Sequence, residues 1–563
     1  MPAIKDRDLR KALTARRNAM DAEYSYWDGH FRELRESIKP TMGRFDTTEH
    51  RSDSSINKRI LDSTPEMALR TLRAGLMSGI TSPSRPWFRL GLRGSTADDM
   101  DFAAKEWLHE VQRRMYEVMR GSNIYRMLER NYADLGLFGT SCSLVLSDFD
   151  DVIRGHSMPV GSYRLADDGM GRVIAMHREI KMPIRTIVEM FGIERVSTDV
   201  RRAWDKSNYY ETRIICHAVE KRSKGDPKAL KASDRPWSSC YWEKAGGPDE
   251  LLMVSGHRYR PLLAPRWEHV EGEAWSASSP GMVALGDART LQVLQKEKAI
   301  AIQKMHNPPL IGGPVQGASF FKNVPGGFTA MAQTDLSMGG IRPAYEVKPD
   351  IQGLLLDIQE TQRRVDTAFY RDLFQMTDMA LSGRASITAT EIAERHEEKL
   401  MALGPVLESL DHELLQPLIE ATFAYMQDAD ILPDAPDSIT GEAIKVDYIS
   451  LLAQAQKAIG VGAIERTIGF AGTLAQIKPS VIDLLDEDQM MREFADQVGP
   501  PPGILLSPEE VAEKRKAAAQ AAAQAQAVAA AEPLAGAANL LSQATLNGQE
   551  APVSYTHLTL PTK

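Results

Sequence analysis

PGMVALGDARTLQVLQKEKAIAIQKMH at residues 280–306 and DIQGLLLDIQETQRRVDTAFYRDLFQ at residues 350–375 are the two stretches that decide the fold. Each reads as one long helix, because Pro280 suits a first helical position and Asp350 is a good N-cap. At 1.5 Å per residue, both helices would be about 40 Å long. The segment between them, 307–349, is rich in glycine and proline, which indicates a compact irregular or small β insert. The order predicts a helix–insert–helix unit that is suited to lining something.

A loop and a third helix follow this unit directly. Residues 376–388 are loop-like, and Thr388 with Glu391 forms a capping box, in which each side chain satisfies a free backbone N–H. We expect the helix that begins there to extend over 388–430. A proline inside a helix removes a backbone hydrogen bond and bends the helix, so we expect kinks at two positions. These positions are Pro405 and Pro417.

Residues 1–279 carry an α+β pattern, with helices first and an antiparallel sheet after them. Helical periodicity marks residues 5–38, 56–79, 98–120 and 123–136. Strand-like runs occur at residues 87–90, 141–147, 173–182, 213–221 and 237–244. Between them, residues 159–171 have the turn chemistry of a loop that returns into a strand. The fold class expected for the whole chain is α+β and mainly helical.

The C-terminal part is predicted to be mostly helical. Residues 446–458 and 463–475 look helical, and 507–531 form an Ala/Gln-rich helix that begins with a capping box. Residues 553–563 fit nothing before them and resemble the translated end of a transposon-based sequencing adapter. We therefore exclude them from functional reasoning.

Composition narrows the class of protein. The chain has 563 residues, 43% hydrophobic and 25% charged, as in ordinary globular proteins. No run approaches the roughly 20 apolar residues of a membrane span, and no signal peptide is visible, so neither membrane insertion nor export is expected. The formal net charge of −9 differs from that of the usual basic nucleic-acid-binding protein. The three cysteines lack metal or disulfide spacing, so we expect buried free thiols at Cys142, Cys216 and Cys240.

The motifs of catalysis are missing from the sequence. There is neither a G-x-x-x-x-G-K-[ST] phosphate loop nor an H-E-x-x-H helix. The nearest approaches to a metal motif, at 395–398 and 411–413, read as charges on the solvent face of a helix. Acidic clusters at 148–151 and 483–488 are better explained by turn chemistry or by helix N-terminal charge. We therefore expect no enzyme activity, no metal site and no cofactor.

Short motifs along the chain occur in an order that is more informative than any one of them. They are DSTP at 62–65, LRAGLMSG at 72–79, TSPSRPWF at 81–88, PVGSY at 159–163, PRW at 265–267, KMHNPP at 304–309, TATE at 388–391, VDYISLLAQAQK at 446–457 and the 482–515 segment. In this order the chain resembles the portal, or head-to-tail connector, proteins of short-tailed (podovirus-type) bacteriophages. The resemblance covers roughly residues 5–515.

The resemblance implies a homo-oligomeric ring, usually of twelve subunits, at one vertex of the virion capsid. Double-stranded DNA would enter through the ring during packaging and leave at infection, while a separate terminase supplies the ATPase. A tail adaptor, scaffold and major capsid proteins would be further partners, and assembly would take place in the host cytoplasm. The family subdomains would be the wing (1–279 and 431–479), stem helices (280–306 and 350–375), clip (307–349), tunnel loop (376–388), kinked helix (388–430) and helical crown (480–545).

A ring of stem helices leaves room for a DNA duplex. Twelve helices packed about 10 Å apart have their axes on a circle about 38 Å across, which leaves a bore of about 28 Å against a duplex of roughly 20 Å. Twelve copies at −9 each carry −108 formal charges, which disfavours tight DNA adhesion and suits sliding.

A few basic side chains are nevertheless expected to face the channel. Arg384 in the predicted tunnel loop is the first candidate, and Arg363, Arg364 and Lys399 are weaker ones. For the helical candidates, salt bridges between subunits or a solvated helix face remain the alternative. For the chain as a whole, the alternative is a non-catalytic helical scaffold or adaptor that binds protein partners.

Overall fold

The fold of the chain is given by a computed structural model. The described residues are 4–46, 60–92, 102–247, 249–306, 310–311, 342–343, 350–374, 403–436, 444–448, 467–469, 471, 473, 488–491 and 511–524. The predicted tunnel loop, most of the predicted clip and residues 553–563 lie outside them.

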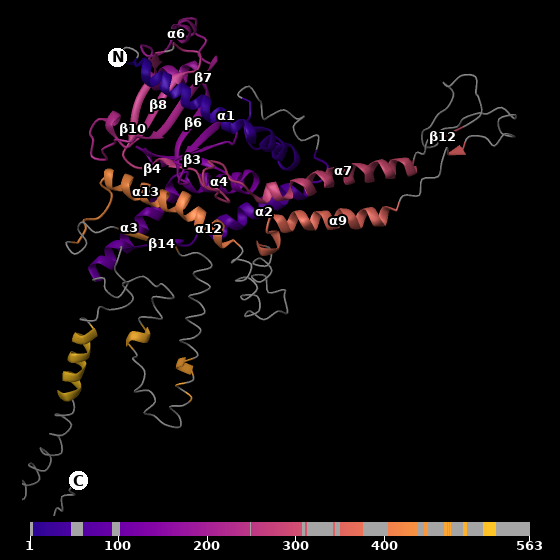
Figure 1. Cartoon of the computed structure of the whole chain (residues 1–563). Coiled ribbons are helices and arrows are strands. Elements are labelled where there is room, and N and C mark those ends of the chain that lie inside the picture. The colour runs from indigo at the N-terminus through magenta and orange to yellow at the C-terminus, as the bar shows by residue number, and fades with distance from the viewer. Residues whose placement is uncertain are drawn as a thin grey trace, which may run out of the picture.

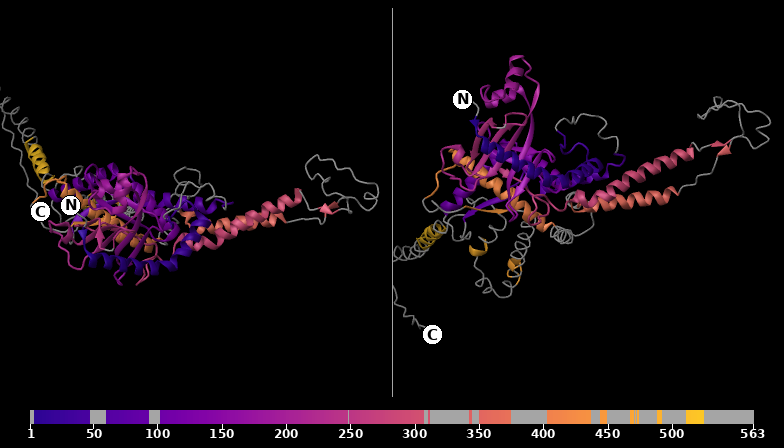
Figure 2. Two further views of the ribbon diagram at one scale, coloured as in Figure 1. Left: turned by 90° about the horizontal axis from the view of Figure 1, so that it is seen from above. Right: turned by 45° about the horizontal axis from the view of Figure 1, so that its top comes forward.

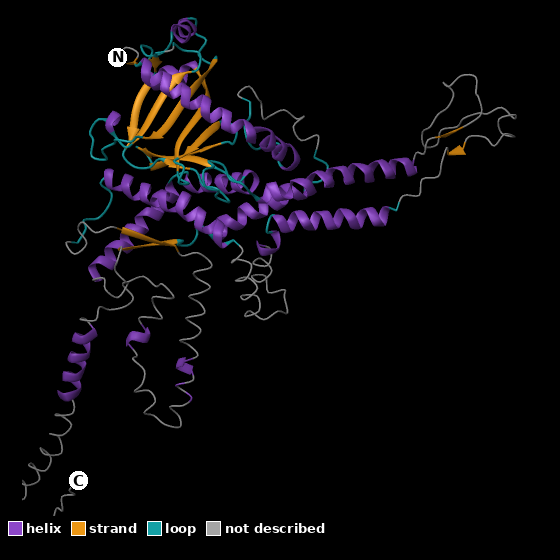
Figure 3. Ribbon diagram, viewed as in Figure 1, coloured by secondary structure: helices purple, strands orange, loops and turns teal. Residues whose placement is uncertain are grey.

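The N-terminal helix lies across a sheet. After β1 (Ile4–Lys5), α1 extends over Arg7–Ile38, and the Asp6 side chain caps it by accepting a hydrogen bond from the Leu9 N–H at 2.9 Å. Leu13 on α1 packs in one apolar cluster with side chains of two neighbouring strands of that sheet, including Cys216 and Trp242. Figures 1 and 3 show α1 crossing this sheet.

Three further helices build the body under α1. They are α2 (Thr64–Gly79), α3 (Phe102–Gly121) and α4 (Ile124–Phe138), with β2 (Phe88–Leu92) between α2 and α3. The helix α4 is the most buried of the three and ends at Gly139, whose φ of 74° is the left-handed conformation that glycine adopts freely. The predicted helices therefore exist, but the prediction of 56–79 is wrong at its start, because the described residues 60–63 are not helical and α2 begins at Thr64.

The antiparallel sheet that the sequence predicts is present as two sheets. The larger has the order β10-β8-β7-β6-β5 and the smaller β11-β3-β4. Their strands are β3 (Cys142–Asp148), β4 (Val152–Met158), β5 (Tyr163–Asp167), β6 (Val173–Pro183), β7 (Thr212–Lys221), β8 (Trp237–Glu243), β10 (Met253–His257) and β11 (Leu262–Leu263). Short elements connect them: α5 (Ile184–Phe191), α6 (Thr198–Asp205), η1 (Ala232–Asp234) and β9 (Glu250–Leu251), which pairs with β1. The loop expected at 159–171 is a partial error, because β5 lies inside it and pairs with β6.

Aromatic side chains fill the core where α1, α4 and the sheet meet. Tyr163 stacks on Trp275 with ring centroids 5.6 Å apart, and Phe31 meets Phe138 edge-on at 5.7 Å. All four side chains are almost completely buried. The three cysteines are buried and free, as expected. Among the helices that the structure describes, none is long and apolar enough to cross a bilayer.

A helical hairpin projects from the body. Its arms are α7 (Pro280–His306) and α9 (Ile351–Ala368), which lie side by side in both views of Figure 2. Two-residue strands, β12 (Leu310–Ile311) and β13 (Arg342–Pro343), pair beyond its far end. The prediction for 280–306 is confirmed to the residue. The prediction of an unbroken helix over 350–375 is wrong, because the chain turns at Phe369–Tyr370, where Tyr370 has a φ of 55°.

The last described helices return to the body. They are α12 (Gly404–Leu410), a π-helical turn η3 (Asp411–Leu415) and α13 (Gln416–Asp428). The predicted helix at 446–458 is wrong at its start, since β14 (Ile444–Tyr448) is a strand that pairs antiparallel with β2. Helical residues are also described at 467–469, 488–491 and 511–524.

Candidate functional site

The projecting α7–α9 hairpin is the candidate functional site, and its root is fixed to the body. Ser279 lies just before α7, and its Oγ accepts a hydrogen bond from the Met282 N–H at 3.0 Å. The same hydroxyl donates to the carbonyl of Leu137, near the end of α4, at 3.0 Å. The first turn of α7 is therefore capped and attached to α4 by one side chain.

Burial along the hairpin divides it into a packed root and an exposed outer part. The buried residues of α7 end at Leu291, and those of α9 begin at Ile358. Beyond the root, large apolar side chains face solvent in the single subunit. Their exposed fractions include 52% for Val293, 49% for Met305 and 67% for Leu356. An exposed apolar surface of this kind indicates that another protein surface covers it.

A buried carboxylate connects α2 with both arms of the hairpin. Asp62 is 7% exposed, and its Oδ1 accepts from the Thr64 N–H at 2.8 Å. Its Oδ2 accepts from Nε2 of Gln295 on α7 at 2.7 Å and from Nε2 of Gln362 on α9 at 2.9 Å. Burial acts to raise the pKa of Asp62, but these hydrogen bonds outweigh it and lower the pKa below its ordinary value.

Backbone groups beside this carboxylate are held by a third glutamine. Gln292 Oε1 accepts from the N–H groups of Leu61 and Asp62, at 2.6 and 2.9 Å. Its Nε2 donates to the Asp62 carbonyl at 3.0 Å. The amide of Gln292 thus pairs with the backbone of residues 61–62 in both directions, as a neighbouring strand would.

Ion pairs link the hairpin arms to each other and to α1. Arg364 on α9 pairs with Asp287 on α7, Nε to Oδ1 at 3.1 Å, and with Glu360 on its own helix at 3.1 Å. Arg289 on α7 pairs with Glu33 on α1. These pairs are half exposed, so each stabilises the arrangement by at most about 1 kcal/mol.

Comparison of the sequence with known proteins places the chain in a family. The family model described as "Bacteriophage head to tail connecting protein" matches residues 10–505. The chain belongs to this family. It therefore has the role of a connector between the head and the tail of a bacteriophage.

Two curated relatives agree with this assignment over nearly the full length. The "Portal protein" of Salmonella phage epsilon15 is 40% identical over 506 residues, which cover 89% of this chain and 90% of that one. The "Probable portal protein" of Bordetella phage BPP-1 is 39% identical over 520 residues, covering 91% and 93%. A chain in the virion of a gene transfer agent particle covers 77% of this connector at 10% identity, and the TM-score of 0.35 is too low to establish a shared fold.

The two neighbouring arginines that the sequence analysis proposed for the connector's channel make different contacts. Arg364 is held in the ion pairs with Asp287 and Glu360. Arg363 is exposed, and its guanidinium makes no ion pair with any residue in the described part of the chain. The other candidates, with the proposed helix cap, lie outside the described residues: Arg384, Lys399, Thr388 and Glu391.

The two prolines predicted to kink the third helix each lie in the first turn of a helical segment. Pro405 occupies the first turn of α12. Pro417 lies in the first turn of α13, directly after the π-helical turn, in which the Gln416 N–H bonds to the Asp411 carbonyl. A π turn shifts the hydrogen-bond register, and such turns are frequent at functional sites.

The prediction that residues 411–413 carry charges on a solvent face is wrong for Glu413, which lies in this π turn and pairs with a buried arginine. The side chain of Arg266 is completely buried and ion-paired with Glu413. The backbone N–H of Arg266 donates to Glu413 at 2.8 Å, and Ser409 donates back to the Arg266 carbonyl at 2.8 Å. The guanidinium also donates to the carbonyls of Gly171 and Glu273. Sequence reasoning missed this pair because its partners are 147 residues apart.

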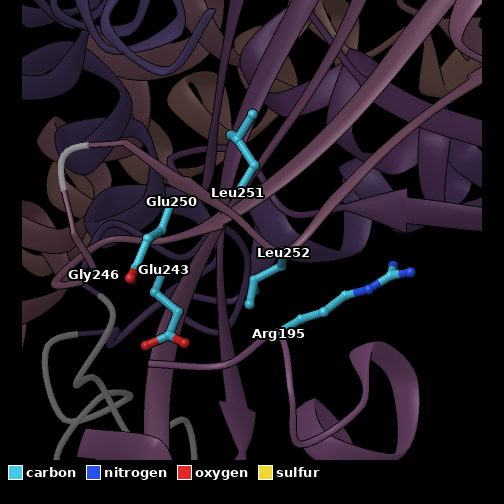
Figure 4. Close-up of a pocket in the computed structure, with 6 residues that line it drawn as sticks. All are labelled: Arg195, Glu243, Gly246, Glu250, Leu251 and Leu252. Atoms are coloured by element: carbon cyan, nitrogen blue, oxygen red, sulfur yellow. The ribbon is translucent and has the colours of Figure 1, made fainter. Parts of the chain in front are cut away.

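Two hollows of the described body differ in size, one small and one open. One, shown in Figure 4, has a volume of about 10 Å³, room for at most one water molecule. Its Glu243 accepts hydrogen bonds from the N–H and Oγ of Ser197 at 2.7 and 2.6 Å. A wider hollow lies between α1 and residues 272–273. Among the described residues, no three metal-binding side chains are close enough to hold an ion.

Proposed function

We propose that copies of this chain form a ring, twelve to a ring, at one capsid vertex, and that the α7–α9 hairpins surround the channel for double-stranded DNA. The DNA enters through the ring during genome packaging and leaves through it at ejection. The observation that carries this proposal is the family match over residues 10–505, since the two curated relatives bear the name portal protein.

The outer part of the hairpin supports the ring. Val293, Met305 and Leu356 are exposed in one subunit and would be covered by the hairpins of neighbouring copies. A bore of about 28 Å between twelve such helices admits a duplex. The net charge of −9 per subunit keeps the ring from holding the DNA tightly.

The remaining assignments belong to the same proposal. The wing is 1–279 with 431–479, the clip 307–349, the tunnel loop 376–388 and the crown 480–545. Terminase, the tail adaptor, scaffold and major capsid proteins are the partners, and assembly takes place in the host cytoplasm. The chain itself catalyses no reaction, because terminase hydrolyses the ATP. An adaptor that binds only proteins is the alternative, and no observation on the hairpin favours it.

The oligomeric state of the purified protein tests the ring. Native mass spectrometry is expected to give a closed assembly of twelve subunits, and particle images down the axis should show a central hole wide enough for a duplex. A protein that stays monomeric or dimeric at every salt and protein concentration would refute the ring.

Charge reversal at the two neighbouring arginines is expected to have different effects. Arg363→Glu should leave ring assembly unchanged and reduce the amount of DNA packaged, because it places an exposed negative charge near the phosphates. Arg364→Glu should instead loosen the hairpin, because it sets a carboxylate beside Asp287 and Glu360. Packaged DNA per particle and the thermal midpoint of the ring are the two measurements. Normal packaging by Arg363→Glu would remove this residue from the channel, and the same test with Arg384→Glu applies to the tunnel loop.

A further inference from the structure

The carboxylate of Asp62 accepts the outermost hydrogen bonds that join the hairpin to the body within the described residues. On α7 its partner is Gln295, four residues after Leu291, the last buried residue of that helix. Gln292 bonds to the backbone of Asp62 rather than to the carboxylate. On α9 its partner Gln362 lies one residue after the buried Thr361. No glutamine beyond this point on either arm bonds to the described body.

Hydrogen bonds alone hold this carboxylate. Asp62 makes no ion pair with any described residue, and it accepts three hydrogen bonds from three different helices. A buried carboxylate that lost these donors would retain its desolvation penalty, so the donors have to stay in place. The arrangement thus favours one position of α7 and α9 relative to α2.

We propose that Asp62 is a positioning residue that sets the direction in which the hairpin leaves the body and, through it, the width of the channel. The part about the channel rests on the proposed function, whereas the part about direction concerns a single subunit. The hairpin is long, so a small change at its root is amplified. The part of α7 beyond Leu291, its last buried residue, is about 22 Å long, so a tilt of 10° moves its end by about 4 Å.

The test removes the two hydrogen bonds that the Asp62 carboxylate accepts from the hairpin and keeps the one that it accepts from the Thr64 N–H. The variant is Gln295→Leu with Gln362→Leu, and the matched control is Gln303→Leu with Gln359→Leu, the same change at exposed positions of the same helices. Spin labels on cysteines introduced at Tyr26 and Met305 report the distance between α1 and the outer part of α7. Both positions are exposed, and the three native cysteines are buried and do not react in the folded protein.

The distance is measured within one subunit, diluted into unlabelled protein. We expect one narrow distribution for wild type and control, and a distribution shifted or broadened by several Å for the double variant, as for the tilt of about 10° above. Asp62→Asn should keep the wild-type distribution, because the asparagine Nδ2 can donate to both glutamines once their amides rotate.

Two outcomes separate this inference from the proposed function. An unchanged distribution in the double variant, with only a lower thermal midpoint, would overturn the positioning role and leave the ring standing. If the wild-type protein forms no ring, the proposed channel is refuted, while the distance measurement still decides whether Asp62 positions the hairpin. If the proposed ring and the positioning role of Asp62 are both correct, the double variant forms rings that package less DNA than the control.

Discussion

Replacing Arg266 with leucine is expected to lower the free energy of unfolding by about 3–5 kcal/mol, the usual cost of breaking a buried ion pair by removing one partner. The arginine side chain is fully buried, and Glu413 would keep its charge without its partner. The carbonyls of Gly171 and Glu273 would also lose a donor. The loss should appear as a lower urea midpoint by circular dichroism.

Two further variants test the cause of that loss. Arg266→Leu combined with Glu413→Leu should recover a large part of it, because no buried charge is left unpaired. Arg113→Leu removes an arginine with carboxylate partners at the surface of α3, and should leave the midpoint unchanged. If Arg266→Leu changed stability no more than Arg113→Leu, the buried pair would not be what holds the π turn against the body.

Alanine substitutions at two glycines of α7 are expected to change stability in opposite directions. A Cβ on Gly281 would lie 2.4 Å from the carbonyl oxygen of Leu137, and a backbone atom cannot rotate away. Gly281→Ala should therefore cost about 1–3 kcal/mol, as overpacking does. A Cβ on Gly286 meets nothing within 4 Å, so Gly286→Ala should gain about 0.5–1 kcal/mol through helix propensity.

The pair of variants shares one helix, one chemical change and one assay. Urea unfolding of the two proteins should place their midpoints on opposite sides of wild type. The Gly281 variant should also show a displaced hairpin, because α7 must move off α4 to admit the new methyl group. Equal midpoints for the two variants would mean that α7 does not begin in backbone contact with α4.

The sequence predicted the elements whose ends carry local signals. Pro280 and the prolines after His306 mark both ends of α7, and Asp350 caps α9 by accepting from the Gly353 N–H at 2.9 Å. The turn at Tyr370 was missed because a positive φ at a tyrosine has no sequence signature.

Contacts between distant parts of the chain could not be predicted in the same way. β14 was read as the start of a helix, although Ile444, Val446 and Tyr448 alternate with polar residues as in a strand. Its partner β2 is some 350 residues earlier, and only the fold brings the two together. Asp62 and its glutamines also gave no signal, because Asp62 fell inside the helix predicted at 56–79 and its partners Gln295 and Gln362 are 233 and 300 residues away.

The pairing of β2 with β14 also affects the order in which the subunit can be completed. β2 leaves the ribosome long before β14 is made, and at 5–20 residues per second the interval is about 20–70 s. During that time β2 lacks the ladder partner that it has in the finished subunit, and an unpaired strand edge is a template for pairing with other chains. A nascent or truncated chain that ends before Ile444 therefore has an open edge. In the finished subunit β14 pairs with that edge, so this edge is closed only after residues 444–448 have been made.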